Sequence, residues 1–436
     1  MIIQNFDKLA RSSLRRQALK IAEAGLEAIS TRRAFEKGFL YNARKDGLSI
    51  LGKKYDLSNF RNVYCVAFGK AAFEGITAVS QILGQRLTSG FAIGLKQSDG
   101  LLAFARRPSS NIVFRTGSHP HPSEQNVEAA KELVEFVSKV KENDLVLCLV
   151  SGGGSALFCN PHSLNVETQA AVLKELMNGG ADIFEMNCVR KHLSLVKGGQ
   201  LAKIIYPAKL ISMIFSDIPG DDLSAIASGP TVKDETTVAD ASAILNKYGI
   251  LHKLNLPALK LSETPKEGRY FEKTENILFV SAKTALFAMK EKAEDLSYEV
   301  KIFDGKFQGI ARELPKKIVP ENQKPGCCYL GAGESTVVVL GSGIGGRNQE
   351  MALAASELLN PKQVFLAVAS DGHDNSDFAG AIVDSQSQAR ARQLGMEPEA
   401  YLANNDSFNF FEALGDGLDT GLTGANVADF VILLNA

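Results

Sequence analysis

Short apolar runs alternate along the chain with segments in which apolar residues recur every three or four positions. The short runs are typical of buried strands, and the recurring pattern is typical of helices that cover a sheet. In the first half of the chain the strands are predicted at 62–68, 91–95, 112–114, 145–150 and 210–215. Because strands that alternate with helices form parallel sheets, we predict an α/β fold with a doubly wound, mostly parallel sheet.

A second set of strands follows a break in this pattern. Residues 251–269 contain two prolines, several charges and little periodicity, as expected of connecting structure. After them, apolar runs predict strands at 276–280, 299–303, 336–340, 364–369 and 430–434. We therefore predict two domains, 1–250 and 251–436, the second a smaller α/β domain, with a boundary that falls within 232–275. Residues 1–29 are predicted to form an amphipathic helix that opens the fold.

Composition excludes several classes of function. The 436 residues, 45% hydrophobic and 22% charged, are typical of a globular protein of two domains. A net charge of -1 gives no reason to expect nucleic acid or an anionic membrane as a partner. No apolar run approaches the ~20 residues of a membrane span. Six cysteines without a Cys-x-x-Cys pair indicate the buried thiols of a cytoplasmic protein.

The turn Ser151-Gly-Gly-Gly-Ser155 carries the most informative chemistry, because it directly follows the predicted strand 145–150. A strand that ends in such a turn exposes backbone N–H groups at the carboxyl edge of a sheet, where α/β proteins bind phosphates and other anions. The turn is not a Walker loop, since no Gly-Lys-Ser/Thr follows. The alternative is a tight turn whose small residues serve packing alone.

Cationic residues lie at the ends of two predicted elements. Lys70 occupies the first turn of a predicted helix, where the helix dipole favours anions, so a lysine there suits an anion shared with the backbone. On a helix through 189–199, Arg190, Ser194 and Lys197 share one face, which suits an anionic ligand. An exposed lysine and a solvated helix face are the alternatives.

Three carboxylates follow the predicted strand 210–215. Asp217, Asp221 and Asp222 lie in one tight turn after it. Carboxylates packed with other oxygen donors suit Mg²⁺ bound together with phosphates. A plain acidic turn is the alternative.

A glycine-rich segment supports a different function. Gly341, Gly343 and Gly346 satisfy G-x-G-x-x-G after the predicted strand 336–340, and Asp371 follows 25 residues later. This spacing is close to the fingerprint of a dinucleotide-binding site. The glycines lead straight into Arg347, however, and an arginine at a helix entrance better suits a phosphoryl group or a carboxylate.

Many of these segments belong to motifs that occur together in one family. The motifs are Phe68-Gly-Lys-Ala-Ala72, His119-Pro120, Ser151-Gly-Gly-Gly-Ser155, Val189-Arg-Lys-His-Leu-Ser194 with Lys197-Gly-Gly199, Ser216-Asp-Ile-Pro-Gly-Asp-Asp222 with Ala227-Ser-Gly-Pro-Thr231, Gly345-Gly-Arg-Asn-Gln-Glu350, and Asp371-Gly372 with Asp374. In this order, from about residue 60 to the end, the chain resembles the class II glycerate kinases, or glycerate 2-kinases. Their C-terminal part is called the MOFRL domain and corresponds here to about 327–434.

The resemblance implies a Rossmann-like first domain and an enzyme that phosphorylates D-glycerate at its 2-hydroxyl. ATP would be the phosphoryl donor, 2-phosphoglycerate and ADP the products, and Mg²⁺ the cation. Members of the family have often been labelled hydroxypyruvate reductases, so an NAD(P)-dependent hydroxypyruvate reductase is the alternative. A nucleotide sensor without catalysis is a third. The sequence leaves open whether the chain forms a homodimer.

Each candidate residue receives an expected role. Lys70 and Arg347 would stabilise charge on the transferring group, Asp217 would act as base, and Asp221 would bind the metal. The nucleotide phosphates would lie against Ser151, Gly152, Gly153, Gly154, Ser155 and Lys197. Arg190, Asp371 and Asn426 would bind D-glycerate. The family's Asp after the His-Pro segment is Ser123 here, a departure that bears on substrate detail more than on reaction type.

Overall fold

The computed structural model describes residues 1–95, 111–218, 220–321 and 323–436. Its internal contacts divide the chain into two compact units, each described here by itself. The larger unit comprises 34–216 and 221–279, and the smaller unit comprises 1–33, 217–220 and 280–436.

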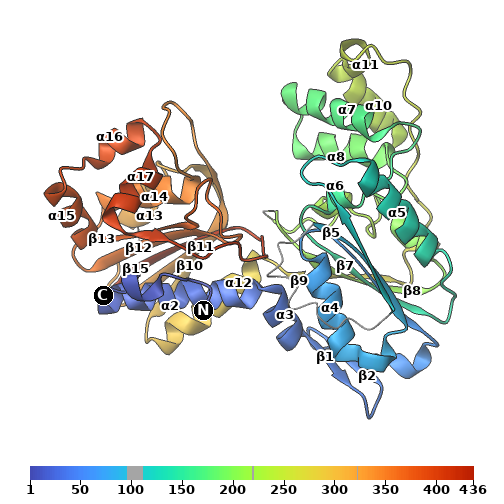
Figure 1. The fold of residues 1–436 in the computed structure, drawn as a ribbon, viewed down its shortest axis with the longest axis horizontal. Coiled ribbons are helices and arrows are strands. Elements are labelled where there is room, and N and C mark those ends of the chain that lie inside the picture. The colour runs from blue at the N-terminus through green and yellow to red at the C-terminus, as the bar shows by residue number, and fades with distance from the viewer. Residues whose placement is uncertain (96–110, 219, 322) are drawn as a thin grey trace. The chain divides into compact units, whose positions relative to one another are not determined.

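The larger unit is built on a six-stranded sheet in the order β6-β5-β4-β7-β8-β9 (Figure 1). Its strands are β4 (Val63–Phe68), β5 (Ser89–Leu95), β6 (Ile112–Gly117), β7 (Leu145–Val150), β8 (Lys209–Phe215) and β9 (Thr274–Val280). From β6 through β8 every neighbouring pair is parallel. The carboxyl ends of β4, β7 and β8 therefore share one edge of the sheet, as the sequence predicted.

Two helices cover opposite faces of this sheet. Helix α4 (Ala72–Leu83) packs on the face of Gly90, where an added Cβ would lie 2.9 Å from Ile76 Cδ1. Helix α5 (Glu124–Val137) packs on the other face, where the Phe136 and Phe91 rings lie 5.9 Å apart. The expectation of a doubly wound sheet is confirmed.

Two smaller substructures complete the larger unit. A group of helices that lie together in Figure 1 has its own apolar core. Val172, Val189 and Leu245 belong to this core. The helices of this group are α7 (Val166–Asn178), α8 (Ile183–His192), α10 (Val238–Lys247) and α11 (Ile250–Lys253). An antiparallel sheet consists of β1 (Phe39–Asn42), β2 (Gly47–Ile50) and β3 (Lys53–Asp56).

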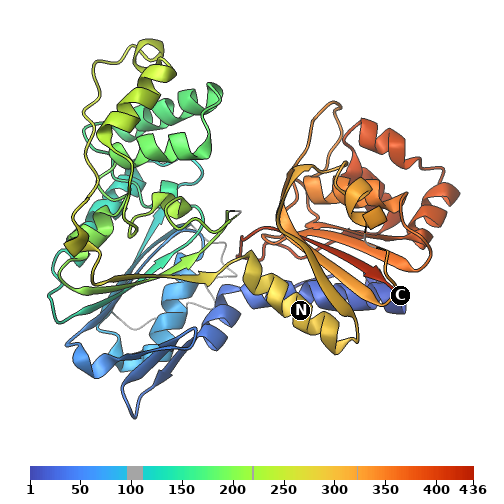
Figure 2. The ribbon, with the colours of Figure 1, turned by 180° about the vertical axis from the view of Figure 1, so that it is seen from behind.

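The smaller unit contains a second sheet, drawn in orange and red in Figure 2. Its six strands lie in the order β10-β11-β15-β12-β13-β14. Its strands are β10 (Glu299–Ile310), β11 (Cys327–Thr336), β12 (Gln363–Ala369), β13 (Gly380–Asp384), β14 (Gly417–Leu418) and β15 (Asp429–Asn435). The pair β10/β11 is parallel and the other pairs are antiparallel. The last strand of the chain, β15, lies between β11 and β12, which explains why this α/β sheet is mixed.

Helices cover both faces of the second sheet (Figure 1). Helices α2 (Ser13–Ile29) and α12 (Ala282–Asp295) pack on each other, and α2 also contacts β12 and β15. The remaining helices of the unit are α1 (Phe6–Leu9), α13 (Pro315–Glu321), α14 (Arg347–Ser356), α15 (Ser385–Gln393), α16 (Pro398–Ala403) and α17 (Ser407–Leu414).

The two units differ from the expected division at residue 250. Residues 1–33 group with the smaller unit, and residues 251–279 group with the larger one, where the strand predicted at 276–280 is β9 of the first sheet. Arg15 on α2 is fully buried and donates to Asp416 Oδ1 at 2.8 Å. An amphipathic pattern predicts a helix, but it does not tell which core the apolar face covers.

The strand predicted at 336–340 is wrong. Strand β11 ends at Thr336, and the side chains of Val339 and Leu340 are 73% and 75% exposed. A short apolar run is by itself ambiguous, and here it forms a surface loop. The glycines of the fingerprint therefore do not follow a strand directly.

Two other expectations concern the whole chain. The six cysteines are all buried and unpaired, as predicted. Among the described residues, no helix is both long and apolar enough to span a bilayer.

Candidate active site

Two turns at the carboxyl edge of the larger sheet are joined by hydrogen bonds. The turn after β7 presents Ser151 Oγ, which accepts from the N–H of Ala71 at 3.1 Å. The N–H of Lys70 in turn donates to the carbonyl of Gly152 at 2.8 Å. Gly69 has a φ of 114°, and a Cβ there would lie 2.2 Å from Ser151 Oγ, so only glycine lets the turns meet so closely.

Lys70 and His119 lie beside the middle of the serine–glycine turn. Gly153 has a φ of 78°, and a Cβ on it would lie 3.0 Å from His119 Cδ2 and 3.4 Å from Lys70 Cγ. Burial, and then the Lys70 ammonium, lower the pKa of the His119 imidazole. The structure thus brings Lys70 to the turn, as predicted, and adds His119, which the sequence marked only as part of a motif.

Arg190 and Lys197 do not share a helix face, and this expectation is wrong. Helix α8 ends at His192, and the chain then turns at Gly198 and Gly199, whose φ values are 58° and 84°. Ser194 already pairs with Pro161 in an isolated antiparallel bridge, so the chain has left the helix well before the glycines.

Lys197 is buried and anchors the serine–glycine turn from behind. Its side chain is 1% exposed, and Nζ donates to the carbonyl oxygens of Ser155 at 2.8 Å and Phe158 at 3.1 Å. Burial lowers the pKa of the amine to about 7. Its observed contacts are with backbone carbonyls, which hold helix α6 (Gly154–Leu157) in place.

Four polar side chains converge near the end of this turn, and we call them the Arg190 cluster: Ser155, Asn187, Arg190 and Ser228. Arg190 Nη1 donates to Asn187 Oδ1 at 2.8 Å and reaches Ser228 Oγ at 3.5 Å. Ser228 Oγ donates to Asn187 Oδ1 at 3.0 Å and lies 3.1 Å from Ser155 Oγ. Burial lowers the pKa of the Arg190 guanidinium.

Ser228 is presented by a strained turn. Ala227 and Ser228 both have positive φ, 51° and 62°, which non-glycine residues seldom adopt. The Ser228 carbonyl accepts from Gly198 N at 3.0 Å, and the Gly229 carbonyl accepts from Gly199 N at 2.8 Å. Backbone strain of this kind persists where the surroundings enforce it, and it concentrates at functional sites.

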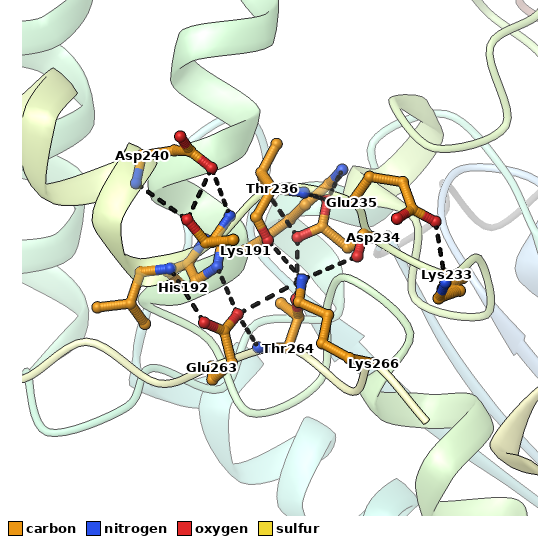
Figure 3. A network of polar contacts seen from close by, with 12 residues as sticks. Lys191, His192, Lys233, Asp234, Glu235, Thr236, Asp240, Glu263, Thr264 and Lys266 are labelled. Carbon is orange, nitrogen blue, oxygen red and sulfur yellow. Dashed lines mark hydrogen bonds and ion pairs between the residues drawn. The ribbon is translucent and has the colours of Figure 1, made fainter. Parts of the chain in front are cut away.

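Lys191, Asp234 and Thr264 are the buried members of a larger network of polar contacts beside these turns (Figure 3). Lys191 Nζ lies 3.0 Å from Asp234 Oδ1, and Thr264 Oγ1 donates to Asp234 Oδ2 at 3.1 Å. Burial acts to raise the pKa of Asp234, but the Lys191 ammonium and hydrogen bonds lower it overall. Gly198 fits against this network, since a Cβ there would lie 2.7 Å from Thr264 Cγ2.

The acidic turn after β8 is divided between the units. Contacts group Asp217 with the smaller unit and Asp221 with the larger one. Asp221 has a φ of 58°, and Asp222 Oδ1 accepts from Ser224 N at 2.9 Å. Within the described residues, no group of three or more His, Cys, Asp or Glu side chains is placed to hold a metal ion.

Arg347 in the smaller unit is held by two carboxylates. Its Nε and Nη2 donate to Asp429 at 2.5 and 3.2 Å, and its Nη1 donates to Glu334 at 2.7 Å. Burial acts to lower the pKa of Arg347, yet Asp429 and Glu334 raise it, so the guanidinium stays charged. Burial also raises the pKa of Asp429 to about 7, although Arg347 opposes this.

The first turn of α14, which begins at Arg347, is capped by Asp374. The N–H groups of Asn348 and Gln349 donate to its carboxylate at 3.0 and 2.8 Å. A Cβ on Gly346 would lie 2.0 Å from the Asp374 carbonyl oxygen. Because Asp374 already occupies these N–H groups, this helix entrance differs from one that binds a pyrophosphate.

Asp371 and Asn426 lie on two adjacent loops of the smaller unit. The Thr423 N–H donates to the Asp371 carbonyl at 3.1 Å, and a Cβ on Gly372 would lie 1.9 Å from the Gly421 carbonyl oxygen. Both side chains are half-buried. The loop that carries Asp371 follows β12, and the loop that carries Asn426 precedes β15. Ala369, at the end of β12, is paired with Asp429, at the start of β15.

The candidate residues are thus distributed over both units, and the hydrogen bonds described above join only some of them. In the larger unit the structure brings together Lys70, the Ser151–Ser155 turn, Arg190 and Lys197. It adds Asn187 and Ser228, which the sequence analysis missed as site residues. Ser228 lies in the motif Ala227-Ser-Gly-Pro-Thr231, whereas nothing in the sequence marked Asn187.

Family models match most of the chain. The model of a domain of unknown function, DUF4147, matches residues 17–263, and the MOFRL family model matches residues 327–429. Curated relatives include a D-glycerate 2-kinase from Thermotoga maritima, 34% identical over 96% of this chain and 98% of its own. A glycerate 2-kinase from Pyrococcus horikoshii is 33% identical over 96% of this chain and 98% of its own. A putative hydroxypyruvate reductase from Agrobacterium vitis is 40% identical, over 75% of this chain and 78% of its own.

Solved structures agree with these matches. The crystal structure of a glycerate kinase from Thermotoga maritima has a TM-score of 0.85 and 32% identity, covering 97% of this chain and all of its own. The crystal structure of a protein from Pyrococcus horikoshii has a TM-score of 0.85 and 31% identity, covering 98% of this chain and 99% of its own. The chain therefore belongs to the glycerate 2-kinase family, with a DUF4147 region followed by a MOFRL region.

Proposed function

We propose that the chain transfers the γ-phosphoryl group of ATP to the 2-hydroxyl of D-glycerate, which gives 2-phosphoglycerate and ADP. One observation carries this proposal: Lys70 lies against a serine–glycine turn at the carboxyl edge of a parallel sheet. Phosphates bind where backbone N–H groups and a cation meet at such an edge. The likeness over nearly the full length to a D-glycerate 2-kinase supports the choice of acceptor.

Phosphoryl transfer depends on positioning and on neutralising charge, with little covalent help from the protein. We assign the Ser151–Ser155 turn to the nucleotide phosphates. Lys70 and Arg347 are assigned to the negative charge on the transferring group, where cations stabilise a transition state most. Both are accessible: Lys70 is exposed, and the Arg347 side chain is 36% exposed despite its carboxylate partners.

Carboxylates supply the remaining roles. Asp217 is assigned to accept the hydroxyl proton, and Asp221 is assigned to hold Mg²⁺. One or two carboxylates fit this ion, because phosphates and waters fill its other positions. When bound, the ion would neutralise phosphate charge. Asp371 and Asn426 are assigned to contacts with D-glycerate.

The hydroxypyruvate reductase is the second candidate, and the name of one relative favours it. Two observations weaken it for this chain. Strand β11 ends at Thr336, before the glycine fingerprint, and Asp374 occupies the entrance of α14. A pyrophosphate turn needs both a strand before the glycines and free N–H groups after them.

Paired assays on the purified chain separate the candidates. One measures ADP release with ATP, Mg²⁺ and D-glycerate, and the other measures NADH or NADPH oxidation with hydroxypyruvate. We expect glycerate-dependent ADP release and no oxidation. Oxidation without ADP release would establish the reductase, and ATP binding without turnover would indicate a nucleotide sensor.

A further inference from the structure

The Arg190 cluster offers hydrogen-bond donors and no negative charge. Among the described residues Arg190 forms no ion pair, and its only hydrogen bonds there come from Nη1. Its Nε and Nη2 groups therefore remain available to a ligand. The Arg190 residue is half-buried, so these groups can be reached by an anionic ligand from solution. A guanidinium without a carboxylate partner suits such an anion, to which it can bond in a fork.

The orientation of the Asn187 amide is fixed by chemistry. Arginine can only donate, so the atom that faces Arg190 Nη1 must be the carbonyl oxygen Oδ1. Ser228 donates to the same oxygen. Asn187 Nδ2 then points elsewhere, and no hydrogen bond among the described residues uses it, so it is a further donor for a ligand.

The two serines form a short chain of hydrogen bonds toward Asn187. Ser228 has a single hydroxyl hydrogen, which it gives to Asn187, so Ser155 must donate in the Ser155–Ser228 pair. The Ser155 hydroxyl can turn toward a ligand without breaking the bond to Asn187. Arg190, Asn187 and Ser155 thus present donors together.

The cationic charge of this cluster comes from one guanidinium. Lys197, the nearby lysine, donates to two backbone carbonyls and lies behind the turn. A single guanidinium with neutral donors around it matches a monoanion such as a carboxylate, to which Arg bonds in a fork. A triphosphate carries three to four negative charges and typically needs several cations and a metal ion.

We infer that Ser155, Asn187, Arg190 and Ser228 form the subsite for the carboxylate of the hydroxy acid, with Lys197 as a positioning residue. This inference rests on the proposed function. It refines the assignment of the site, because Ser155 and Lys197, which were expected to bind the nucleotide phosphates, now serve the binding of the acceptor, D-glycerate. It also makes Asn187 and Ser228 determinants of specificity for an acid over a neutral alcohol.

Asn187→Asp tests the subsite with the smallest change in shape. The new carboxylate would pair with Arg190 and repel the carboxylate of the substrate. A charged hydrogen bond contributes ~1.5–3 kcal/mol, so we expect KM for D-glycerate to rise by roughly 10- to 100-fold. KM for ATP should change by less than about threefold. Arg190→Lys, which keeps the charge but loses the fork, should raise KM for D-glycerate in the same way.

A neutral substrate analogue and a matched variant provide the controls. Glyceramide lacks the carboxylate charge, so the wild type should strongly prefer D-glycerate to it, and Asn187→Asp should reduce this preference. Arg115→Gln removes an exposed arginine of the same unit, paired with Glu132, and should leave both KM values unchanged.

Direct binding keeps this inference separate from the proposed function. Calorimetric titration with D-glycerate, and separately with a non-hydrolysable ATP analogue, needs no turnover. D-glycerate binding that is lost in Asn187→Asp and Arg190→Lys supports the subsite, even if the wild type releases no ADP. Loss of ATP-analogue binding with D-glycerate binding intact would assign the cluster to the nucleotide. Unchanged binding of both in folded variants would also overturn the inference.

Discussion

Lys197 Nζ donates to the Ser155 carbonyl at 2.8 Å, and it does so in a buried place where no described carboxylate pairs with it. The ammonium instead relies on two backbone carbonyls. This relationship connects the turn after α8 with the serine–glycine turn after β7. It also makes the free energy of unfolding depend on pH, because burial lowers the pKa of this amine to about 7.

The larger unit should become more stable between pH 7 and pH 9.5. The unfolded lysine, with a pKa of about 10.4, binds more protons in this range than the folded one, so stability rises with pH. The contribution of Lys197 should approach, at most, ~1.4 kcal/mol per pH unit. Urea unfolding of the wild type and of Lys197→Met at several pH values measures it. The free energy of unfolding of the wild type should increase relative to that of Lys197→Met as the pH rises.

Lys203→Met changes an exposed lysine on the neighbouring helix α9 (Gln200–Ile205) and is the matched control. Its free energy of unfolding should change with pH in the same way as that of the wild type. If that of Lys197→Met also changes in this way, the buried amine does not titrate as described.

Gly69→Ala should force the two turns of the phosphate site apart. The new Cβ would lie 2.2 Å from Ser151 Oγ. We expect kcat/KM for ATP to fall by at least about tenfold, which corresponds to ~1.4 kcal/mol. Gly52→Ala places a side chain at a similar positive φ, 85°, with nothing within 4 Å, and controls for backbone strain. Equal losses of activity in both variants would mean that the contact with Ser151 is unimportant.

Arg15→Met should strongly destabilise the smaller unit. Arg15 and Asp416 are both fully buried, and their closest atoms lie 2.8 Å apart. Breaking a buried pair typically costs ~3–5 kcal/mol, and we expect the lower end because Arg11 and Arg390 also contact Asp416. Thermal unfolding should show this loss. Arg16→Met, at an exposed ion pair on the same helix, should change little; similar melting of both variants would argue against the role of Arg15.

Lys70→Met and Arg347→Gln should lower kcat by about 10²-fold each, because they remove charge that meets the transition state. Turnover at saturating ATP and D-glycerate measures this. Lys324→Gln removes an exposed cation of the smaller unit, paired with Glu299, and serves as the control. Near-normal kcat in either test variant would remove that residue from the mechanism.

The sequence predicted the sheet edge well, and physical reasons explain where it failed. The apolar run 145–150 and the turn after it are local signals, so the strand and the serine–glycine turn were found. The prediction of a strand at 336–340 was wrong because the sequence of an apolar run does not tell whether the run is buried in a sheet or exposed in a loop. Arg190 and Lys197 do both lie close to the serine–glycine turn. They come together there because the chain turns after helix α8 ends, and not because they share a helix face. Asn187 and Ser228 are 41 residues apart, and no local pattern joins them.

Phosphorus NMR of the reaction tests the central claim most directly. The purified chain is mixed with ATP, Mg²⁺ and D-glycerate, and the phosphorus signals are followed over time. The account predicts that the γ-phosphate signal of ATP declines while those of 2-phosphoglycerate and ADP grow. Growth of 3-phosphoglycerate instead, or an ATP signal that does not change with D-glycerate, would contradict it.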